Sequence, residues 1–431
     1  MYGIIIVCRY NYQTSSETSE APSYLSLLRN TALLRFPSKS IPSNRKDHYI
    51  KMKHHLYHPN FPFVLAPESF DKYTDRSLLQ YSLGATMYMP GTKDYAPKIL
   101  SGNLSGLTTI VFCFEDACPE AQVLQAEENV YRLLDTVGNA VEQGTLSKDS
   151  VPLIFVRIRD LQQFERFAAK LKKSQIRYLC GINFPKFNAQ NGRAYYELLR
   201  HLNRRFGEIL YGMPIIEDPA VAYKESRMDE LLKIKEILLE YRDLVLQVRV
   251  GGTDFSSVFG VRRGVDYTIY DIAPVRDCLA DIINVFGRNN DFVISGPVWE
   301  FFRAPKELMF DTLPEHGLED YLLKRVPLVN NEIDGLLREV ILDKANGFIG
   351  RTVIHPTHVK FVNALMSVTK EEYLDAMMIL GNPEGGVLKG EGSNKMNEIK
   401  PHTNWATKIA YRARAFGVIE NEGAYFRLFA D

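Results

Sequence analysis

Eight short apolar runs, separated by longer stretches, constrain the fold of this chain more than any other feature. The runs are rich in β-branched and aromatic residues, as strands are. Most of the stretches between them carry apolar residues at spacings of three and four, which is the period of an amphipathic α-helix. Apolar strands that alternate with helices predict a parallel sheet covered by helices on both faces. The runs cover residues 85–91, 108–116, 151–158, 177–186, 209–217, 244–252, 291–296 and 347–356.

Two α/β architectures fit this alternation. Eight strand–helix units across roughly 280 residues match the size of a (β/α)8 TIM barrel. A doubly wound open sheet is the alternative, but it usually has fewer strands, and the first run lacks the G-x-G-x-x-G pattern that follows the first strand of a dinucleotide-binding fold. We predict a TIM barrel over residues 75–365. A C-terminal helical segment over 366–431 is expected to pack on the barrel or on a neighbouring subunit.

Residues 1–74 form the predicted N-terminal extension, which we expect to be largely irregular. Ser, Thr, Pro and Asn dominate its composition up to about residue 44. A second methionine, Met52, precedes a histidine-rich stretch, and we expect the residues before it to add little to stability. The stretch contains His54, His55 and His58, which are typical of either a metal site or a solvated, flexible segment. The polar composition favours the second interpretation.

Charge and cysteine content limit the possible partners. Lys plus Arg and Asp plus Glu both number 52 among the 431 residues. A protein that binds nucleic acid or a membrane surface usually shows a basic excess, and no run approaches the ~18 apolar residues that a membrane span needs. Five dispersed cysteines without a C-x-x-C pair are typical of a reducing compartment. We therefore expect a cytoplasmic protein without nucleic-acid or membrane partners.

Polar side chains gather at the carboxyl ends of the predicted strands, where the active site of a TIM barrel lies. The run "IVFCFEDACPE", for example, passes directly from apolar residues into two carboxylates. Four carboxylates at one mouth would repel each other strongly, and a divalent cation such as Mg2+, which prefers oxygen ligands, relieves that repulsion. The strand-end residues are Glu115, Asp116, Arg157, Lys186, Glu217, Asp254 and His355.

The strand-end residues can be given separate roles. Glu217 and Asp254 follow adjacent strands and are the simplest Mg2+ ligands, because Mg2+ takes one or two protein carboxylates and keeps waters and substrate oxygens. Glu115 and Asp116 are then placed to hold metal-bound waters. Arg157 suits bidentate pairing with the carboxylate of an oxo-acid or dicarboxylate substrate. For any one of these residues, a salt bridge on the barrel rim is an equally good interpretation.

Two turns and one histidine add weaker signals. Gly91 lies in "MPGT", a tight turn whose backbone N–H groups are available to an anion, and the glycines of "VGGTDF" allow a ligand to approach the backbone. His355 in "IHP" is either a general base or a hydrogen-bonded histidine that locks the start of a helix. We favour the helix-start interpretation.

Seven motifs occur together in the order of a known family. The chain resembles the HpcH/HpaI aldolase and citrate lyase β-subunit family over roughly residues 80–420. Within it, the chain is most similar to a divergent carbon–carbon bond lyase branch often encoded beside tellurium-resistance genes in bacteria. The motifs are "ATMYMPGT", "TTIVFCFEDACPE", "FVRIRD", "NFPK", "MPIIEDPAV", "GGTDF" and "GFIGRTVIHPTHV".

The resemblance implies a Mg2+-dependent barrel that cleaves or forms a carbon–carbon bond next to a carbonyl, commonly on acyl-CoA thioesters. It implies metal ligation by Glu217 and Asp254. Substrate binding falls to Arg157, with Glu115 and Asp116 nearby as further catalytic groups, and we add Gly91 and Lys186 to the substrate-binding set. The resemblance also implies assembly into a homotrimer or homohexamer, with C-terminal segments that reach across subunits.

The chain departs from the family pattern at several places. Arg159 stands where a neutral side chain is usual. Asn397 occupies the place of a C-terminal aspartate that acts as a catalytic acid in some members, and an amide cannot donate a proton as an acid. Thioester hydrolysis of the malate-synthase kind is therefore not expected, although Glu398 is a candidate substitute. The stretch "RRGVDYTIYD" also offers a way to recast the substrate pocket.

Three hypotheses follow. The first is a Mg2+-dependent carbon–carbon lyase or aldolase that acts on a 2-oxo or 2-hydroxy acid or its acyl-CoA thioester. The second is a barrel homologue with a biosynthetic or ligand-binding role that has lost the usual lyase reaction, which Asn397 favours. The third is a phosphoenolpyruvate-type barrel enzyme with similar use of a metal. The intact set of Glu217, Asp254 and Arg157 favours the first.

Overall fold

The computed structural model describes residues 51–102, 104, 106–304, 317–390 and 396–430. Residues 49–431 cluster into one compact unit. The predictions made for residues 1–50 lie outside the described part of the chain. Among the helices that the structure describes, none combines the length and the apolar character that a membrane crossing requires.

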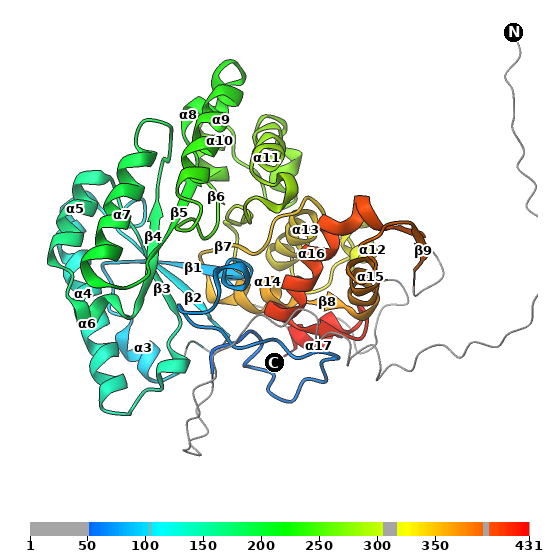
Figure 1. Cartoon of the computed structure of the whole chain (residues 1–431), viewed down its shortest axis with the longest axis horizontal. Helices are drawn as coiled ribbons and strands as arrows, with labels where there is room; N and C mark the ends of the chain where they lie inside the picture. Colours follow the sequence, from blue (N-terminus) through cyan, green and yellow to red (C-terminus); the bar gives the residue numbers. More distant parts are fainter. Residues whose placement is uncertain (1–50, 103, 105, 305–316, 391–395, 431) are drawn as a thin grey trace, which may run out of the picture. The chain divides into compact units, whose positions relative to one another are not determined.

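A parallel sheet forms the centre of the fold (Figure 1). Its strands lie in the order β6-β5-β4-β3-β2-β1-β7, and every neighbouring pair is parallel. Six of them are consecutive in sequence as well as in space, as expected for repeated strand–helix units. The strands are β1 Ala85–Pro90, β2 Thr109–Cys113, β3 Leu153–Arg157, β4 Leu179–Phe184, β5 Tyr211–Ile216, β6 Arg249–Val250 and β7 Arg351–Val353.

Residues 293–296 close the sheet into a ring. Ile294 forms a parallel bridge with Val248, next to β6, and Gly296 forms one with Arg351 of β7. The Ser295 N–H donates to Val248 O at 2.9 Å. The predicted run 291–296 therefore occupies the eighth strand position, and the predicted TIM barrel is confirmed. Its pairing is short because a proline, which has no N–H for the ladder, follows Gly296.

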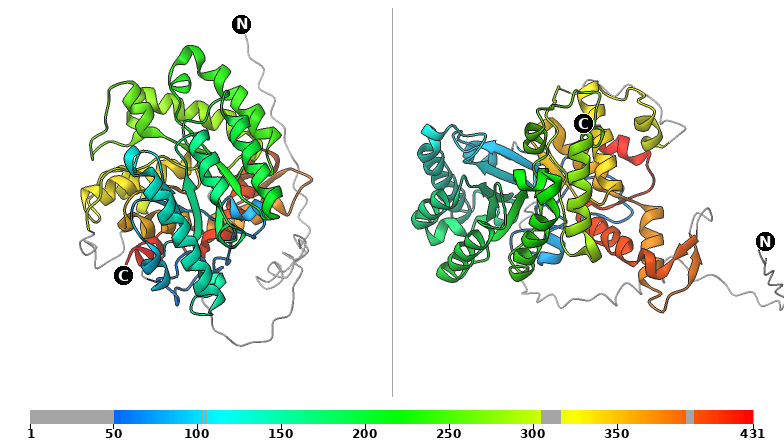
Figure 2. Two further views of the ribbon diagram at one scale, coloured as in Figure 1. Left: turned by 90° about the vertical axis from the view of Figure 1, so that its left-hand side faces the viewer. Right: turned by 90° about the horizontal axis from the view of Figure 1, so that it is seen from above.

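Helices cover the outer side of the strands, as Figures 1 and 2 show for α4 to α7 around β2 to β5. The helix α4 illustrates why: Val130, Leu134 and Val137 are buried along one face at helical spacing. The helices up to the last strand are α2 Arg76–Leu79, α3 Ala96–Leu100, α4 Val123–Glu142, α5 Leu161–Lys170, α6 Lys173–Ile176, α7 Gly192–Phe206, α8 Pro219–Ala222, α9 Lys224–Glu240, α10 Gly252–Val258, α11 Ala273–Phe286, α12 Leu318–Leu323 and α13 Asn331–Ala345.

The barrel interior has its own apolar cluster, separate from the one beneath the helices. Side chains alternate along β3, so that Phe155 lies in the interior cluster while Ile154 and Val156 pack in the outer one. Leu79 and Leu83, from the segment before β1, join the interior cluster. Because this segment enters at the amino ends of the strands, it plugs the bottom of the barrel and leaves the opposite mouth for a site.

The histidine-rich stretch does not form a solvated segment, so that expectation is wrong. His54 is completely buried, and its ring stacks on Phe416 with centroids 4.3 Å apart. The His55 Nε2 lies 3.1 Å from Phe416 O, while His58 Nε2 lies 2.8 Å from Ala430 O. Burial lowers the pKa of His54 to about 3. The partner residues come from the far end of the chain, which local composition cannot reveal.

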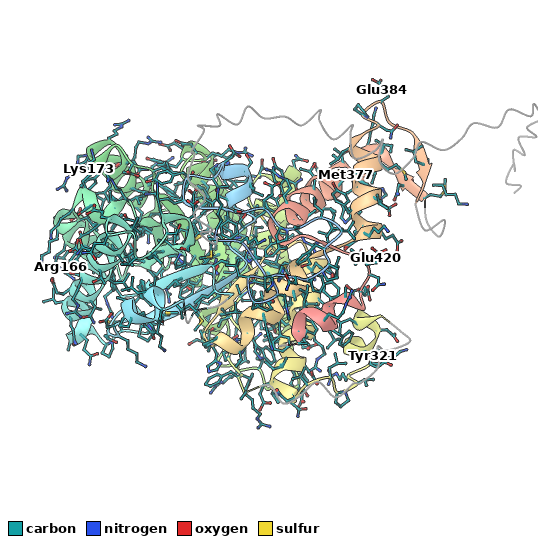
Figure 3. All side chains as sticks on the ribbon, turned by 90° about the horizontal axis from the view of Figure 1, so that it is seen from below. Arg166, Lys173, Tyr321, Met377, Glu384 and Glu420 are labelled. Atoms are coloured by element: carbon teal, nitrogen blue, oxygen red, sulfur yellow. The ribbon has the colours of Figure 1, made fainter. Side chains whose placement is uncertain are left out.

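The C-terminal segment packs partly on the barrel and partly on itself. Phe416 and Tyr425 join the main apolar cluster, whereas Ala376 and Ile409 belong to a small cluster between α15 and α16. In Figure 3, Met377 marks this segment. Its elements are α14 Val359–Met366, β8 Val368–Thr369, α15 Lys370–Leu380, β9 Val387–Lys389, β10 Met396–Glu398, α16 Ile399–Phe416, β11 Val418–Ile419 and α17 Ala424–Phe429.

Candidate active site at the barrel mouth

Arg157, the last residue of β3, forms ion pairs with three of the predicted carboxylates. Its Nη2 lies 2.8 Å from Glu115 Oε2 and 2.9 Å from Glu217 Oε1. Its Nη1 lies 2.9 Å from Asp116 Oδ2. These residues follow β2 and β5, so the predicted gathering of polar groups at the carboxyl ends of the strands is present in the structure. Burial favours loss of the Arg157 charge, but Glu217 and Glu115 outweigh it and raise the pKa of Arg157 well above its ordinary value.

Lys186 completes this group from the end of β4. Its Nζ contacts Glu115 Oε1, and its backbone N–H donates to Glu217 Oε1 at 3.0 Å. Its φ of +45° is unusual for a residue with a side chain. The Lys186 carbonyl accepts a hydrogen bond from Asn191 Nδ2 at 2.9 Å, which helps to hold this conformation. The strained backbone thus turns both the amine and the N–H of one residue toward the carboxylates.

Glu115 and Asp116 differ in environment although they are neighbours. Glu115 is buried, and burial raises its pKa despite the opposing charge of Arg157. The Asp116 side chain is 59% exposed. Its own partial burial works in the opposite direction, but the hydrogen bond to Glu115 and the charge of Arg157 lower its pKa. Glu115 is therefore the better proton carrier of the two, and Asp116 the more permanent negative charge.

Glu217 and Asp254 have carboxylate oxygens that receive no hydrogen bond from the described residues. Burial, and then the charge of Asp254, raise the pKa of Glu217 to about 7, against the effect of Arg157. A side chain at Gly251 would place its Cβ 2.2 Å from Glu217 Oε2, so this glycine is needed for the carboxylate to fit. Within the described residues, no hydrogen-bond donor reaches Glu217 Oε2 or the carboxylate of Asp254, which lies in the first turn of α10.

These features fit a hard divalent cation. Mg2+ needs one or two protein carboxylates and fills its other positions with waters and substrate oxygens. The described residues contain no group of three or more His, Cys, Asp and Glu side chains arranged to hold a metal ion. The assignment of a cation to Glu217 and Asp254 stays a prediction.

Gly91 and His355 have local structural roles. The Gly91 N–H donates to Cys113 O at 3.1 Å, so this N–H is already engaged. A Cβ at Gly91 would lie 3.0 Å from the ring of Phe114, so packing also restricts this position. A role for Gly91 in substrate binding stays a prediction. The Thr357 N–H donates to His355 Nδ1 at 3.3 Å, which confirms that His355 locks the start of the next helical turn.

Two residues that depart from the family pattern lie in different places. Arg159 donates to Cys118 O at 2.7 Å and to Phe114 O at 3.3 Å, so it braces the turn that carries Glu115 and Asp116. Asn397 lies in β10, where its Nδ2 donates to Asp375 Oδ1 at 2.9 Å. Asn397 is thus part of the C-terminal segment and makes no contact with the Arg157 group.

Sequence reasoning missed a polar layer inside the barrel. Arg249 is completely enclosed, and Asn183 Nδ2 donates to the Tyr88 hydroxyl at 2.6 Å. These residues lie within the strands, not at the strand ends to which the sequence-based assignment was confined. The sequence did contain a signal. Side chains alternate along β6 and the residues beside it, so that Gln247, Arg249 and Gly251 lie on the face that lines the barrel interior.

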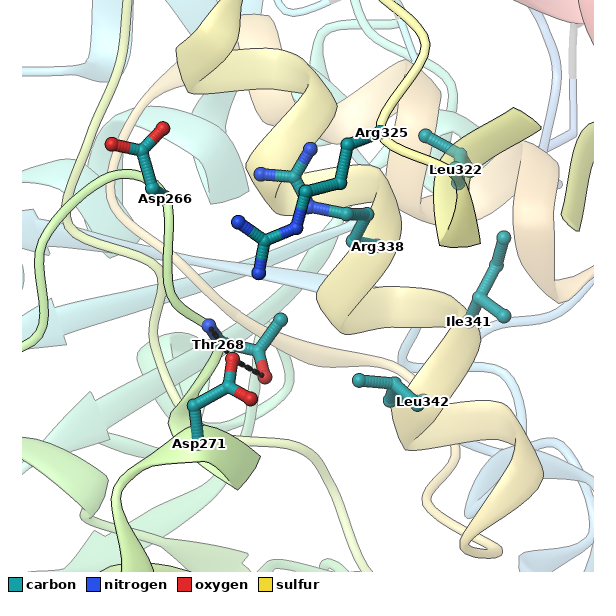
Figure 4. Close-up of a pocket in the computed structure, with 8 residues that line it drawn as sticks. All are labelled: Asp266, Thr268, Asp271, Leu322, Arg325, Arg338, Ile341 and Leu342. Atoms are coloured by element: carbon teal, nitrogen blue, oxygen red, sulfur yellow. Dashed lines mark hydrogen bonds between the residues drawn. The ribbon is translucent and has the colours of Figure 1, made fainter. Parts of the chain in front are cut away.

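A separate cavity of about 130 Å³ lies between α12, α13 and the loop before α11 (Figure 4). Arg325 and Arg338 project into it, and the described residues offer neither of them an ion pair. It shares no lining residue with the Arg157 group. Its walls are Asp266, Thr268, Asp271, Leu322, Arg325, Arg338, Ile341 and Leu342.

Comparison with known proteins identifies the family. Residues 77–418 match the model of a family described as carbon–carbon bond lyases of the TIM-barrel fold. The chain belongs to this family. The match spans the whole barrel and most of the C-terminal segment. No curated protein matches the chain significantly.

Solved structures of similar fold are distant. CitE from Mycobacterium tuberculosis, in complex with magnesium, acetoacetate and coenzyme A, is 16% identical, with 78% of this chain and 99% of that chain covered and a TM-score of 0.47. RipC from Yersinia pestis is 14% identical, with 68% and 99% covered and a TM-score of 0.41. The malate synthase of Haloferax volcanii, in its magnesium/glyoxylate complex, is 10% identical, with 65% and 74% covered and a TM-score of 0.45.

Proposed function

We propose that this protein is a Mg2+-dependent lyase or aldolase that acts on a 2-oxo or 2-hydroxy acid or on its acyl-CoA thioester. The observation that carries the proposal is the pair of Glu217 and Asp254. Both are carboxylates at the barrel mouth, both keep oxygens without a donor, and the Asp254 charge helps to raise the pKa of Glu217 to about 7. Family membership supplies the reaction class.

The charge at the mouth supports a divalent cation. Arg157 and Lys186 pair with Glu115, Asp116 and Glu217, while the charge of Asp254 acts on Glu217 without a cation beside it among the described residues. Like charges held close together destabilise the ionised state, and in the absence of a cation one of them takes up a proton instead. The pKa of Glu217 near 7 agrees with this reasoning. One Mg2+ between Glu217 and Asp254 would offset their mutual repulsion.

The residues present can carry out the steps of carbon–carbon cleavage. Mg2+, when bound, supplies Lewis acidity toward a carbonyl oxygen. Breaking the bond leaves an electron pair on the carbon next to the carbonyl, so negative charge develops on that oxygen. We assign its stabilisation to the fixed guanidinium of Arg157, whose orientation is set by three carboxylates before substrate arrives.

A proton must also be moved, and Glu115 is our candidate for this role. Its buried carboxyl lies between the cations of Arg157 and Lys186, and burial raises its pKa. Asp116 remains ionised and helps to hold Arg157. Lys186 is placed to move a proton with Glu115 or to contact the substrate. Each of these assignments is part of the proposal.

A second candidate function is a barrel homologue that binds a ligand or serves biosynthesis without the usual lyase reaction. Asn397 favours it, since its amide is bonded to Asp375 and supplies no acid. We further propose a cytoplasmic homotrimer or homohexamer. The substrate, the use of CoA and the assembly state are separate questions that light scattering and ligand screening answer directly.

The test of the proposal is product formation from a panel of 2-oxo acids, 2-hydroxy acids and their CoA thioesters, with and without Mg2+. Wild type should cleave or condense at least one member only when Mg2+ is present. Glu217→Gln should abolish this reaction, and Glu332→Gln, a partly buried glutamate on α13, serves as the control. Substrate binding without turnover in wild type would favour the second candidate.

A further inference from the structure

Arg249 is a buried cation surrounded by neutral groups. It lies on β6 inside the barrel and is 1% exposed. Its Nη2 donates to Thr352 Oγ1 at 2.7 Å, and its Nη1 donates to Gln247 Oε1 at 3.0 Å and to Thr86 Oγ1 at 3.3 Å. Its guanidinium carbon lies 5.7 Å from the centre of the Tyr88 ring. None of these partners carries the negative charge that would balance the guanidinium.

The missing counter-charge requires an explanation. No carboxylate of the described residues lies within ion-pair distance of Arg249, and its buried Nε has no hydrogen-bond partner. Burial lowers its pKa, and only the Tyr88 hydroxyl opposes that effect. An unmatched buried charge is strongly unfavourable. A buried donor of this kind suits a water, an ion or a ligand as its partner.

Arg157 shows the contrast. Three carboxylates already surround Arg157, so its charge is more than matched. Arg249 is the cation of the barrel interior whose charge remains available to an anion. Both residues adjoin Tyr88: the Tyr88 hydroxyl contributes to the raised pKa of Arg157, and its ring lies beside Arg249.

The side chains around Arg249 differ in their exposure to solvent. Tyr88 and Thr352 are half-buried, whereas Thr86 and Gln247 are buried. Gln247 Nε2 donates to Gln80 O at 3.2 Å, which places it at the plugged bottom of the barrel. A ligand that approaches Arg249 from the mouth would pass Tyr88 and Thr352.

A second orphaned atom lies along this route. Asn183 pairs in register with Arg157 and donates from Nδ2 to the Tyr88 hydroxyl, while its buried Oδ1 has no hydrogen-bond partner. The Nε of Arg157 is likewise buried without a partner. Unsatisfied donors and an unsatisfied acceptor thus belong to neighbouring residues around Tyr88. This mixture suits a ligand that has both a carboxylate and a hydroxyl or carbonyl oxygen.

We propose that Arg249 binds the carboxylate of a small 2-oxo or 2-hydroxy acid at the floor of the mouth. This inference deepens the proposed function, on which it rests for the identity of the acid. Arg157 then faces the carbonyl oxygen of the substrate while it holds the carboxylates of the protein, and Arg249 receives the carboxylate of the substrate. Asn183 Oδ1 is available to a hydroxyl of the same molecule.

The proposal makes a prediction about the protein without ligand. A structural arginine stabilises the fold, so replacing it lowers the melting temperature. For an arginine kept for an anion, the removal of an unmatched buried charge offsets the loss of its hydrogen bonds. Arg249→Met retains much of the side-chain volume and should melt at the same temperature as wild type or higher.

The experiment compares melting temperatures and calorimetric titrations of wild type, Arg249→Met and Arg338→Met with pyruvate, each with and without Mg2+. Arg338 is a matched control, because it lacks an ion pair among the described residues, has an unpartnered Nε and lines the separate cavity of Figure 4. We expect pyruvate to raise the melting temperature of wild type and of Arg338→Met. Arg249→Met should bind pyruvate at least tenfold more weakly and keep its response to Mg2+ alone.

Each outcome decides a different question. Unchanged pyruvate affinity in folded Arg249→Met would overturn the inference while leaving the Mg2+ proposal intact. If pyruvate binding depends on Arg249 but wild type does not bind Mg2+, the result would support the inference and contradict the proposed function. If Arg249→Met does not fold, Arg249→Lys replaces it; it keeps the charge, loses the fork, and should weaken pyruvate binding with unchanged Mg2+ binding.

Discussion

Two buried clusters of arginine and carboxylate differ in how well their charges are satisfied. In the first, between β7 and α13, Arg351 contacts Glu339 and lies 3.1 Å from Asp343. Arg263 contacts the other oxygen of Glu339, and the Tyr270 hydroxyl donates to Asp343 Oδ1 at 2.7 Å. Both oxygens of Glu339 therefore have donors. Only Glu300, at the partly exposed edge next to Arg263, adds a further carboxylate.

The second cluster, at the mouth, is left incomplete. Arg157 is shared among three carboxylates, while Glu217 Oε2 and Asp254 receive no donor in the described part of the chain. The difference teaches that burial and ion pairs alone do not mark a functional site. In the cluster at β7 and α13, Glu339 and Asp343 each lie within ion-pair distance of an arginine, although Asp343 Oδ2 and Arg351 Nη1 make no hydrogen bond among the described residues. At the mouth, we propose that a further cation completes the pairing.

The largest change in stability should come from the cluster at β7 and α13. Arg351→Met leaves Glu339 and Asp343 buried without their main counter-charge, so we expect a loss of about 3–5 kcal/mol in the free energy of unfolding. Chemical denaturation measures it. Arg414→Met, which breaks an exposed pair with Glu68, should lose no more than about 1 kcal/mol. Equal losses of unfolding free energy in the two variants would contradict a structural role for the cluster at β7 and α13.

The next effect concerns pH and belongs to the mouth. The pKa of Glu217 is about 7 in the folded protein, above its ordinary value of 4.5. Between these values the folded state holds a proton that the unfolded state has released, so stability falls as pH rises through this window, by roughly 3 kcal/mol at most. Glu217→Gln should reduce that fall and leave the share of Asp343, whose burial raises its pKa to about 6, and Mg2+ should flatten the wild-type curve. Parallel stability curves for wild type and Glu217→Gln from pH 5 to 8 would contradict this.

A smaller effect is expected from Arg157→Lys. Lysine keeps one positive charge among the carboxylates but loses the fork that reaches three of them. Mg2+ affinity should be retained, and binding of oxaloacetate should weaken by roughly tenfold, or about 1.4 kcal/mol. Calorimetry with Mg2+ followed by oxaloacetate separates the two effects. Unaltered oxaloacetate affinity would leave Arg157 with a purely structural role like that of Arg351.

The smallest effect is expected outside both clusters. A protein that starts at Met52 lacks the Ser- and Pro-rich segment but keeps the buried Met52 side chain that packs at the plugged end of the barrel. It should melt within a few degrees of the full chain in a thermal scan. A much larger drop would show that the preceding residues stabilise the barrel.

The barrel was predictable because its signal is local and repeated. Each apolar run and each helical stretch carries its own period, and all eight runs take part in the strand ladder or its bridges. The gathering at Arg157 was also predictable, since strand ends in a parallel barrel meet at one mouth. Contacts between remote segments were not. The burial of His54 and His55 depends on Phe416, more than 300 residues away, and the isolation of Arg249 depends on which side chains happen to surround it.

The central claim is that Glu217 and Asp254 hold one Mg2+. Calorimetric titration of Mg2+ at pH 7, in two buffers of different ionisation enthalpy, tests it most directly. Wild type should bind one Mg2+ and release roughly half a proton, because Glu217, with a pKa of about 7, must ionise. Asp254→Ala should bind at least tenfold more weakly, whereas Asp229→Ala, at an exposed position on α9, should match wild type. Equal Mg2+ affinity in all three proteins, without proton release, would contradict the assignment.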